Sequence, residues 1–288
     1  MEKVWLYDRQ IIEISGQDRY IFLQGLVTND VFQIKSTNNA IYSAMLSPKG
    51  RFFYDFFIFE NNNSIYIDCY QSRAEEVARK LNLYKLRSDI KVVLNDKIFV
   101  FWLKEQERSI DIDNNNLIFA DPRSRKMGHR LYCIDDKEYH KNSMPYHKMR
   151  IMNKIPESEY DLTYDKSLIL EFGFDNLNAI NYEKGCYMGQ ELTARTHHTG
   201  QVRKRIHTIE INDCDKVFSN QELKQVANQT NLLKNTNITY SDKSSGLLLS
   251  AVIDNNKMLA LALIRDLGDE IKAGFNGLKI NNYPLKIL

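Results

Sequence analysis

The sequence lacks most of the features that mark specialised classes of protein. Its 288 residues include four cysteines, widely spaced and without a C-x-x-C pair. This spacing excludes a regular disulfide framework and indicates a reducing compartment. No internal repeat is evident. The four cysteines are Cys69, Cys133, Cys186 and Cys214.

Long apolar runs and a strong net charge are also missing. The longest apolar run, residues 258–264, is far shorter than the roughly 20 residues that a membrane-spanning helix needs. The 39 basic and 37 acidic residues leave a formal net charge of +2, so no overall field draws the protein to nucleic acid or to an anionic membrane. We therefore expect neither a membrane nor a direct nucleic-acid partner.

The first residues lack the pattern of a targeting segment, because Glu2 and Asp8 interrupt them. We expect a bacterial cytoplasmic protein, with the mitochondrial matrix as the alternative. With 43% hydrophobic and 26% charged residues, the composition is that of an ordinary globular protein. The length suits about two domains.

The pattern of the first 90 residues mixes strands and helices. We expect a strand over 4–14, then a helix over 18–26 with Ser15 as its N-cap. From residue 40 to residue 70 three apolar segments predict a meander of strands. Pro48 and Gly50 suit the tight turn of residues 47–51.

Further along the chain, Ser72 and Glu75 form a capping-box pattern before a helix over about 73–86. A second helix is expected over 135–153, interrupted or restarted by Pro145. Short strands are expected at 91–94, 98–103, 117–120 and 128–132.

After Gly200 the pattern changes to short apolar segments between polar loops. This pattern is typical of a small antiparallel barrel, with the polar residues 228–245 as a long hairpin loop. We therefore expect two domains, residues 1–200 and residues 201–288.

The chemistry of the chain is concentrated in residues 181–205, N-Y-E-K-G-C-Y-M-G-Q-E-L-T-A-R-T-H-H-T-G-Q-V-R-K-R. Gly185 and Gly189 flank Cys186 and allow other groups to approach the backbone closely. Lys184 beside the cysteine would favour the reactive thiolate, whereas burial in an apolar pocket would make the thiol inert. Exposure therefore separates a functional Cys186 from a structural one.

The histidines and the basic residues of this segment each allow two interpretations. His197 and His198 suggest zinc, but no second cysteine lies nearby, and neighbours on a strand point to opposite faces. We expect no metal site. The basic residues fit a phosphate or RNA patch, or charges on alternate faces of a strand; we favour the strand, because aromatic residues for base stacking are absent. The basic residues are Arg195, Arg203, Lys204 and Arg205.

The run K-G-C-Y-M-G-Q-E at 184–191 resembles the K-G-C-[FY]-x-G-Q-E signature of the YgfZ family of folate-binding-like proteins. That family is related to the glycine-cleavage T-protein and includes a mitochondrial iron–sulfur assembly factor. L-Q-G-L-V-T-N-D at 23–30, S-P-K-G-R at 47–51 with Asp55, and D-P-R at 121–123 followed by a G-x-R also resemble it. The signature residues are Lys184, Gly185, Cys186, Tyr187, Gly189, Gln190 and Glu191.

The resemblance implies an α+β fold of the aminomethyltransferase type: two interleaved α+β lobes plus a C-terminal barrel around a central cleft. It also implies tetrahydrofolate, or a derivative, as cofactor. Glu171 matches a glutamate that holds the pterin ring, and a carboxylate at a strand end can accept two N–H bonds. Lys49, Arg51 and Asp55 would line the cleft, unless Lys49 and Arg51 simply solvate a hairpin tip, and Arg195 would pair with the glutamyl tail.

The function that the resemblance implies is a folate-dependent factor for the assembly or repair of iron–sulfur clusters. Cys186 would be the reactive thiol, and the partners would be cluster-assembly proteins or client enzymes, including tRNA-modifying enzymes. The alternative is a folate-dependent aminomethyl or methyl transferase. Transferases of the T-protein type do not carry the K-G-C-Y-x-G-Q-E run, which favours an assembly factor with little or no catalysis of its own.

Overall fold

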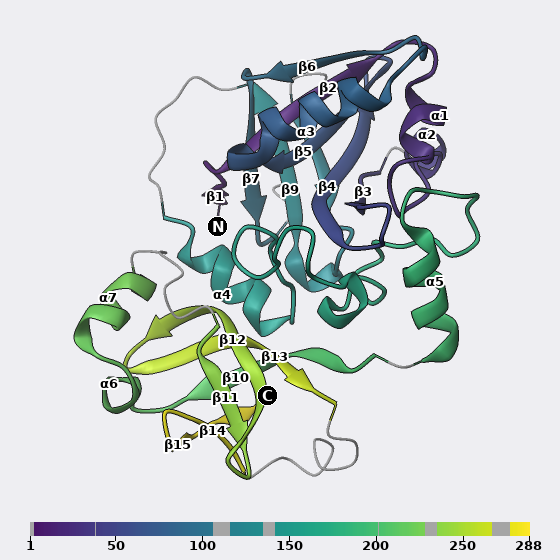
Figure 1. Ribbon diagram of the computed structural model, residues 1–288. Helices are drawn as coiled ribbons and strands as arrows, with labels where there is room; N and C mark the ends of the chain where they lie inside the picture. The colour runs from purple at the N-terminus through teal and green to yellow at the C-terminus, as the bar shows by residue number, and fades with distance from the viewer. Residues whose placement is uncertain are drawn as a thin grey trace. The chain divides into compact units, whose positions relative to one another are not determined.

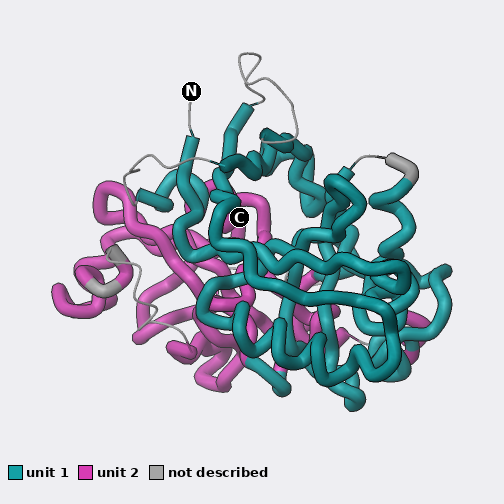
Figure 2. Tube along the Cα trace, turned by 90° about the horizontal axis from the view of Figure 1, so that it is seen from above, with its two compact units in different colours: residues 1–146, 164–166, 174–194 teal, residues 147–163, 167–173, 195–288 magenta. Residues whose placement is uncertain are grey.

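The computed structural model describes residues 3–37, 39–105, 116–134, 142–200, 202–227, 235–266 and 277–288. The chain forms two compact units, shown in separate colours in Figure 2. Unit 1 contains residues 1–146, 164–166 and 174–194, and unit 2 contains residues 147–163, 167–173 and 195–288. No helix in these described ranges is long and apolar enough to cross a membrane.

Unit 1 contains a five-stranded antiparallel sheet in the order β3-β4-β5-β2-β6. The meander expected between residues 40 and 70 is confirmed as β3, β4 and β5. Helix α3 (Gln71–Tyr84) contacts β2, β5 and β6 and lies along the sheet (Figure 1). The strands are β2 (Arg9–Ser15), β3 (Ile41–Leu46), β4 (Phe52–Asn61), β5 (Ser64–Tyr70) and β6 (Lys91–Asn95).

Two expected helix caps in this unit are wrong. Ser15 is the last residue of β2, and helix α1 (Arg19–Gln24) has Asp18 at its N-cap position. Helix α3 starts earlier than the capping box predicted, because the chain passes directly from β5 into the helix at an extended Tyr70. Ser72 therefore lies inside the first turn. Helix α2 (Gln33–Thr37) completes this region.

A second sheet of unit 1 has four strands in the order β1-β7-β9-β8. The apolar segments that predicted strands after residue 97 are confirmed. A 3₁₀ helix, η1 (Arg125–Met127), connects β8 to β9. The strands are β1 (Lys3–Trp5), β7 (Ile98–Leu103), β8 (Asn116–Ala120) and β9 (His129–Ile134).

The tight turn at residues 47–51 is confirmed, and its tip packs on the signature segment. The Gly50 amide donates to the Ser47 carbonyl at 2.8 Å, closing the turn. Gly189 has a φ of +81°, and a Cβ atom added there would lie 2.3 Å from the Ser47 carbonyl oxygen. The turn and the signature can therefore meet only if position 189 has no side chain.

Unit 2 contains a seven-stranded antiparallel, barrel-like sheet in the order β15-β14-β11-β12-β13-β10-β16 (Figure 1). The expected antiparallel barrel is thus confirmed. Its hairpins use Asn255 with Asn256 and Asn281 with Asn282, all at positive φ, as two-residue turns with Asn commonly do. The strands are β10 (Lys204–Ile211), β11 (Asn237–Tyr240), β12 (Lys243–Asp254), β13 (Lys257–Arg265), β14 (Leu278–Ile280), β15 (Tyr283–Pro284) and β16 (Lys286–Ile287).

The polar segment 228–245 was expected to be a hairpin loop, and this is wrong for its second half. Strand β11 and the start of β12 lie within it, and residues 228–234 are outside the described residues. Two helices that the pattern did not indicate precede it, α6 (Cys214–Val217) and α7 (Asn220–Ala227).

Helix α4 (Met144–Met152) has Pro145 in its first turn, where the missing amide costs nothing. Of the helix expected over 135–153, the described residues form a helix only from Met144 to Met152. Residues 135–141 lie outside the described residues. Arg150 of this helix forms a buried ion pair in unit 2, with its guanidinium 2.9 Å from the Asp161 carboxylate. Arg150 also donates to His147 Nδ1 at 2.9 Å.

The His147 ring is buried against Tyr160, and burial lowers its pKa to about 3. Arg150 lowers it further, while Glu157 opposes the shift. The ring is therefore neutral in the folded protein at pH 5, whereas a histidine in the unfolded chain titrates near 6.5. Protonation of the unfolded chain then removes stability as the pH falls below about 6.5.

We expect His147→Gln to reduce the acid sensitivity of the fold. Between pH 7 and pH 5 the wild-type protein should lose about 2 kcal/mol of unfolding free energy through His147, and the variant should not. Urea unfolding at the two pH values measures the difference. His197→Gln, at an exposed histidine, is the control and should keep the wild-type dependence. Equal pH dependence in the wild type and His147→Gln would contradict the buried neutral ring.

Gly189→Ala should destabilise unit 1 by about 2 kcal/mol or more, because the left-handed backbone and the contact with Ser47 both oppose a Cβ atom. Gly185→Ala is a matched control four residues earlier, where an added Cβ atom meets nothing within 4 Å. It should change stability by less than about 0.5 kcal/mol. Thermal unfolding of the two variants tests this, and equal losses would show that the turn does not need a glycine at 189.

Candidate functional site

The signature segment is attached to the loop of residues 24–29 by backbone and side-chain hydrogen bonds. The Asn181 amide donates to the Thr28 carbonyl at 3.1 Å, and the Met188 amide donates to the Gly25 carbonyl at 3.0 Å. The Asn181 side chain accepts hydrogen bonds from the Glu183 and Lys184 amides at 2.8 and 2.9 Å. Two segments that resemble the same family and lie far apart in the sequence are thus joined in unit 1.

Lys184 is the centre of this junction. Its ammonium donates to three carbonyls of the loop: Gln24 at 2.8 Å, Val27 at 2.6 Å and Asn29 at 2.8 Å. Burial lowers the pKa of Lys184 to about 8, against an opposing effect of Asp30. All three ammonium protons therefore have acceptors within the protein, and the sequence had indicated Lys184 only as a neighbour of the thiol.

The segment leads directly into helix α5 (Gln190–Thr199). The Gln190 side chain accepts a hydrogen bond from the Tyr187 amide at 3.1 Å. The Tyr187 ring lies 5.2 Å from the Lys184 ammonium, and burial raises the pKa of Tyr187 to about 12. Glu191 is exposed in the first turn of the helix. Most of the signature residues therefore serve to fix the backbone on both sides of the cysteine.

Cys186 itself is exposed, whereas the other three cysteines are buried. Gly185 beside it is also exposed and faces open space. Burial raises the pKa of Cys69, as expected for an inert core thiol. The structural role that was the alternative for Cys186 needs burial, so it is wrong, and the thiol is accessible from solvent on a fixed segment of backbone.

His197 and His198 lie in helix α5, so the strand assumed for them is wrong. Both are exposed, with ring centroids 5.8 Å apart. Within the described residues, no group of three or more His, Cys, Asp or Glu side chains is arranged to hold a metal ion.

The predicted cofactor residues of unit 1 differ in exposure. Lys49 is exposed at the turn, and Arg51 donates to the Lys166 carbonyl at 2.9 Å. Asp55 is buried and accepts a hydrogen bond from the Tyr42 hydroxyl at 2.6 Å. A carboxylate in the middle of the apolar strand F-F-Y-D-F-F-I-F is costly unless it is hydrogen-bonded, and Tyr42 meets that need.

Three buried arginines around Phe57 form a cluster that the sequence analysis did not identify. The guanidinium carbons of Arg130, Arg123 and Arg9 lie 3.8, 4.7 and 5.7 Å from the Phe57 ring centroid. Asp68 accepts from Arg9 at 2.6 Å and from Arg130 at 2.8 Å. The available signal was a charged residue inside an apolar strand, as in I-Y-I-D-C-Y and H-R-L-Y-C.

The D-P-R element joins the same region. Arg123 pairs with Asp121 through two nitrogen atoms, at 3.0 and 2.8 Å. The Pro122 carbonyl accepts from the Asn178 side chain at 3.0 Å, and the Asn178 carbonyl accepts from the Asn29 side chain at 2.7 Å. All four segments that resemble the family are therefore connected within unit 1.

One guanidinium nitrogen of this cluster is unsatisfied. Arg130 is 1% exposed, and its Nη1 atom has no hydrogen-bond partner among the described residues. A buried donor without an acceptor costs roughly 1–3 kcal/mol. Arg130 Nη1 can therefore donate a hydrogen bond to one more acceptor, such as a carbonyl or carboxylate oxygen of a ligand.

The remaining predicted residues, Glu171 and Arg195, belong to unit 2. Glu171 was expected at a strand end, and this is wrong: it lies half-buried in the 3₁₀ helix η2 (Ile169–Phe172). Arg195 is exposed on helix α5. Each can present its charge to a ligand from the surface of its own unit.

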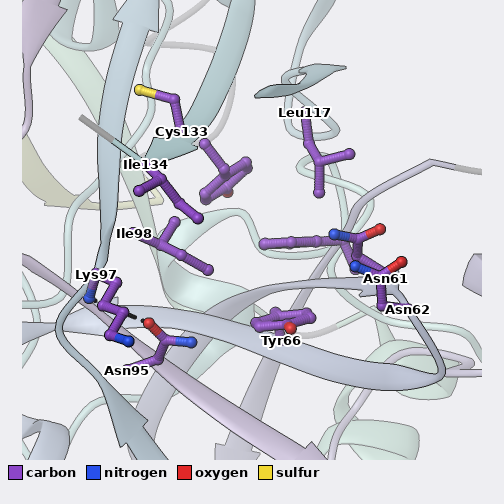
Figure 3. Close-up of a pocket in the computed structure, with 11 residues that line it drawn as sticks. Asn61, Asn62, Tyr66, Asn95, Lys97, Ile98, Leu117, Cys133 and Ile134 are labelled. Atoms are coloured by element: carbon purple, nitrogen blue, oxygen red, sulfur yellow. Dashed lines mark hydrogen bonds between the residues drawn. The ribbon is translucent and has the colours of Figure 1, made fainter. Parts of the chain in front are cut away.

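Unit 1 also contains a cavity of about 180 Å³ between the ends of β4, β7 and β9 (Figure 3). Its wall is aromatic and aliphatic, with Phe59 stacked on Tyr66 at 5.4 Å, and three asparagines and Lys97 at its polar edge. None of the residues predicted for the site lines it.

No known protein-family model matches the chain. Curated proteins similar to it include the mitochondrial iron-sulfur cluster assembly factor IBA57 of Mus musculus, which is 30% identical over an alignment of 233 residues that covers 70% of this chain and 64% of the mouse protein. The homolog from Mycosarcoma maydis is 30% identical over 244 residues, 74% of this chain and 60% of that protein. The chain thus spans less than two thirds of the length of these relatives.

Among solved structures, the chain is similar to the glycine cleavage system aminomethyltransferase T from Bartonella henselae. The TM-score is 0.71 at 8% sequence identity, over 99% of this chain and 84% of that chain. Similarity at this level of identity shows the fold alone. The α+β fold of the aminomethyltransferase type that the motifs implied is therefore confirmed.

Proposed function

We propose that this protein is a folate-binding accessory factor of the YgfZ type for the assembly or repair of iron–sulfur clusters. The observation that carries the proposal is the exposed Cys186 thiol on a backbone segment that Lys184 and Gln190 fix at both sides. The relatives named as iron-sulfur cluster assembly factors support the same function. Residues 1–200 would be the folate-binding region and residues 201–288 the barrel domain.

Cys186 would contact a cluster or a client enzyme. Iron in such clusters is held by thiolate ligands, and a single thiolate needs a partner protein to complete the coordination. The cluster is then cargo shared with an assembly protein or a client, including clients that modify tRNA. An exposed thiol with free space beside it suits such a transient contact, since a partner can reach it without a rearrangement of the core.

Tetrahydrofolate, or a derivative, would be the cofactor, and it supplies a carrier for one-carbon groups when bound. The predicted site residues would supply the hydrogen-bonding and charged groups for it. Glu171 would accept the N–H groups of the pterin ring, and Lys49, Arg51 and Arg195 would pair with the carboxylates of the glutamyl tail. Asp55 would line the site, and the unsatisfied Arg130 Nη1 supports a ligand acceptor in unit 1.

The same relatives support one of the two locations expected from the sequence. They are mitochondrial proteins by name, which supports the mitochondrial matrix. A bacterial cytoplasm, the first expectation from the sequence, requires a bacterial source for the chain. Both compartments are reducing, as the accessible free thiol requires.

A folate-dependent aminomethyl or methyl transferase is the second candidate, and the fold match to an aminomethyltransferase favours it. The two functions differ in turnover. The purified protein, incubated with a one-carbon-loaded tetrahydrofolate and an acceptor amine, should leave the folate unchanged if it is an assembly factor. Repeated turnover, followed by the absorbance of the folate, would support the transferase instead.

Replacing the thiol should separate function from folding. We expect Cys186→Ser to keep the wild-type melting temperature and folate affinity, because the side chain is exposed, and to abolish rescue of cluster-dependent enzymes in cells that lack their own factor of this type. Glu183→Gln, an exposed neighbour, should rescue fully. Full rescue by Cys186→Ser would remove the thiol from the function.

Folate binding should depend on the Glu171 carboxylate. Titration calorimetry with tetrahydrofolate should show affinity weaker by about tenfold or more for Glu171→Gln, since a hydrogen bond to a charged group contributes about 1.5–3 kcal/mol. Asp175→Asn changes a half-buried carboxylate four residues further on and should leave the affinity unchanged. Equal affinities for the wild type and Glu171→Gln would exclude Glu171 from the site.

A further inference from the structure

Two cations face each other in the barrel-like sheet of unit 2. Lys204 of β10 pairs directly with Arg265 of β13 in the antiparallel register. Like charges directly opposite on neighbouring strands destabilise a sheet. Within the described residues, neither side chain has an ion pair or a side-chain hydrogen bond that would compensate its charge. The register therefore leaves two positive charges side by side at one place.

These cations line a hollow of about 120 Å³. The third strand that contributes is β12, where Leu247 pairs with Leu263 and Gly246 with Ile264. Strand alternation then puts Ser245 on the same face as Arg265. The hollow, named here the Lys204–Arg265 hollow, is lined by Lys204, Ser244, Ser245, Gly246, Leu247, Leu263 and Arg265.

The polar and apolar parts of the hollow have different roles. The Ser244 hydroxyl donates to Asn237 at 2.6 Å and the Ser245 hydroxyl donates to the Lys243 carbonyl at 3.1 Å. Both hydroxyl protons are thus used within the protein, and the two cations supply the attraction for a ligand. Leu247 and Leu263 form the apolar part of the wall, and an apolar surface strengthens charge interactions beside it.

The hollow also bears on the basic residues Arg203, Lys204 and Arg205 at the end of the segment 181–205. Lys204 and Arg205 are neighbours on β10, so they point to opposite faces of the sheet, as the strand interpretation predicted. Lys204 lines the hollow and Arg205 does not. The sequence showed a run of cations, but the pairing of one of them with Arg265 comes from the fold.

We propose that the Lys204–Arg265 hollow binds the phosphate group of a small phosphorylated molecule. A phosphate monoester carries a charge of about −1.5 to −2 at neutral pH, which matches two cations, whereas a carboxylate carries one negative charge. Arginine can hold two oxygens of a phosphate at once, and lysine adds a point charge. A nucleic-acid strand fits less well, because none of the described residues that line the hollow is aromatic and able to stack on a base.

The proposal is independent of the iron–sulfur function and of folate. It is tested by titration calorimetry of the full chain with inorganic phosphate, and separately with glutarate as a dicarboxylate, at constant ionic strength. We expect phosphate to bind, and Lys204→Gln/Arg265→Gln to weaken it by about tenfold or more. The control Lys257→Gln/Lys279→Gln removes the same charge from exposed positions of the same sheet and should keep the wild-type affinity.

A second measurement does not depend on the heat of binding. Phosphate should raise the melting temperature of the wild-type protein and not that of Lys204→Gln/Arg265→Gln. Without phosphate, this variant should be at least as stable as the wild type, because it lacks the like-charge pair. The proposal is overturned if phosphate does not bind the wild type, if the control variant loses as much affinity, or if glutarate binds as tightly as phosphate.

Discussion

The three hydrogen bonds of the Lys184 ammonium hold the candidate site together. They bind the signature segment to the carbonyls of Gln24, Val27 and Asn29, and this loop in turn bonds to Ser43 and to Asn178. An ammonium satisfies three acceptors at once because it is compact and has three donors. Together with the backbone hydrogen bonds of Asn181 and Met188, Lys184 therefore holds the backbone on both sides of Cys186.

Buried charges are paired in both units of the protein. Asp68 lies between Arg9 and Arg130, Arg123 pairs with Asp121, and Arg150 pairs with Asp161 in the other unit. Such pairs contribute little net stability when compared with apolar residues, but removing one partner is strongly destabilising. These ion pairs therefore determine which elements pack together, and they add little to the free energy of unfolding.

The exposed thiol and the buried clusters have complementary roles. The segment that carries Cys186 is held by hydrogen bonds to a loop whose Val27 is buried in the core, and Met188 of the segment packs against the same core. Gly189 and Gly50 allow the turn and the signature to come within contact distance without side chains between them. The outcome is a supported backbone with one accessible thiol at its surface, as the proposed contact with a partner requires.

The sequence by itself determined the meander of β3, β4 and β5, the tight turn and the family-like segments, because alternation, turn residues and an unbroken K-G-C-Y-M-G-Q-E run are local properties. The strand expected over 4–14 is wrong, because it is two strands, β1 and β2, in different sheets. It did not determine the starts of α1 and α3, the helix that carries His197, or the 3₁₀ helix of Glu171. These depend on packing that overrides local preference. The tertiary structure alone decided three features: the exposure of Cys186, the acceptors of Lys184, and the pairing of Lys204 with Arg265. Each depends on how segments far apart in the chain pack together.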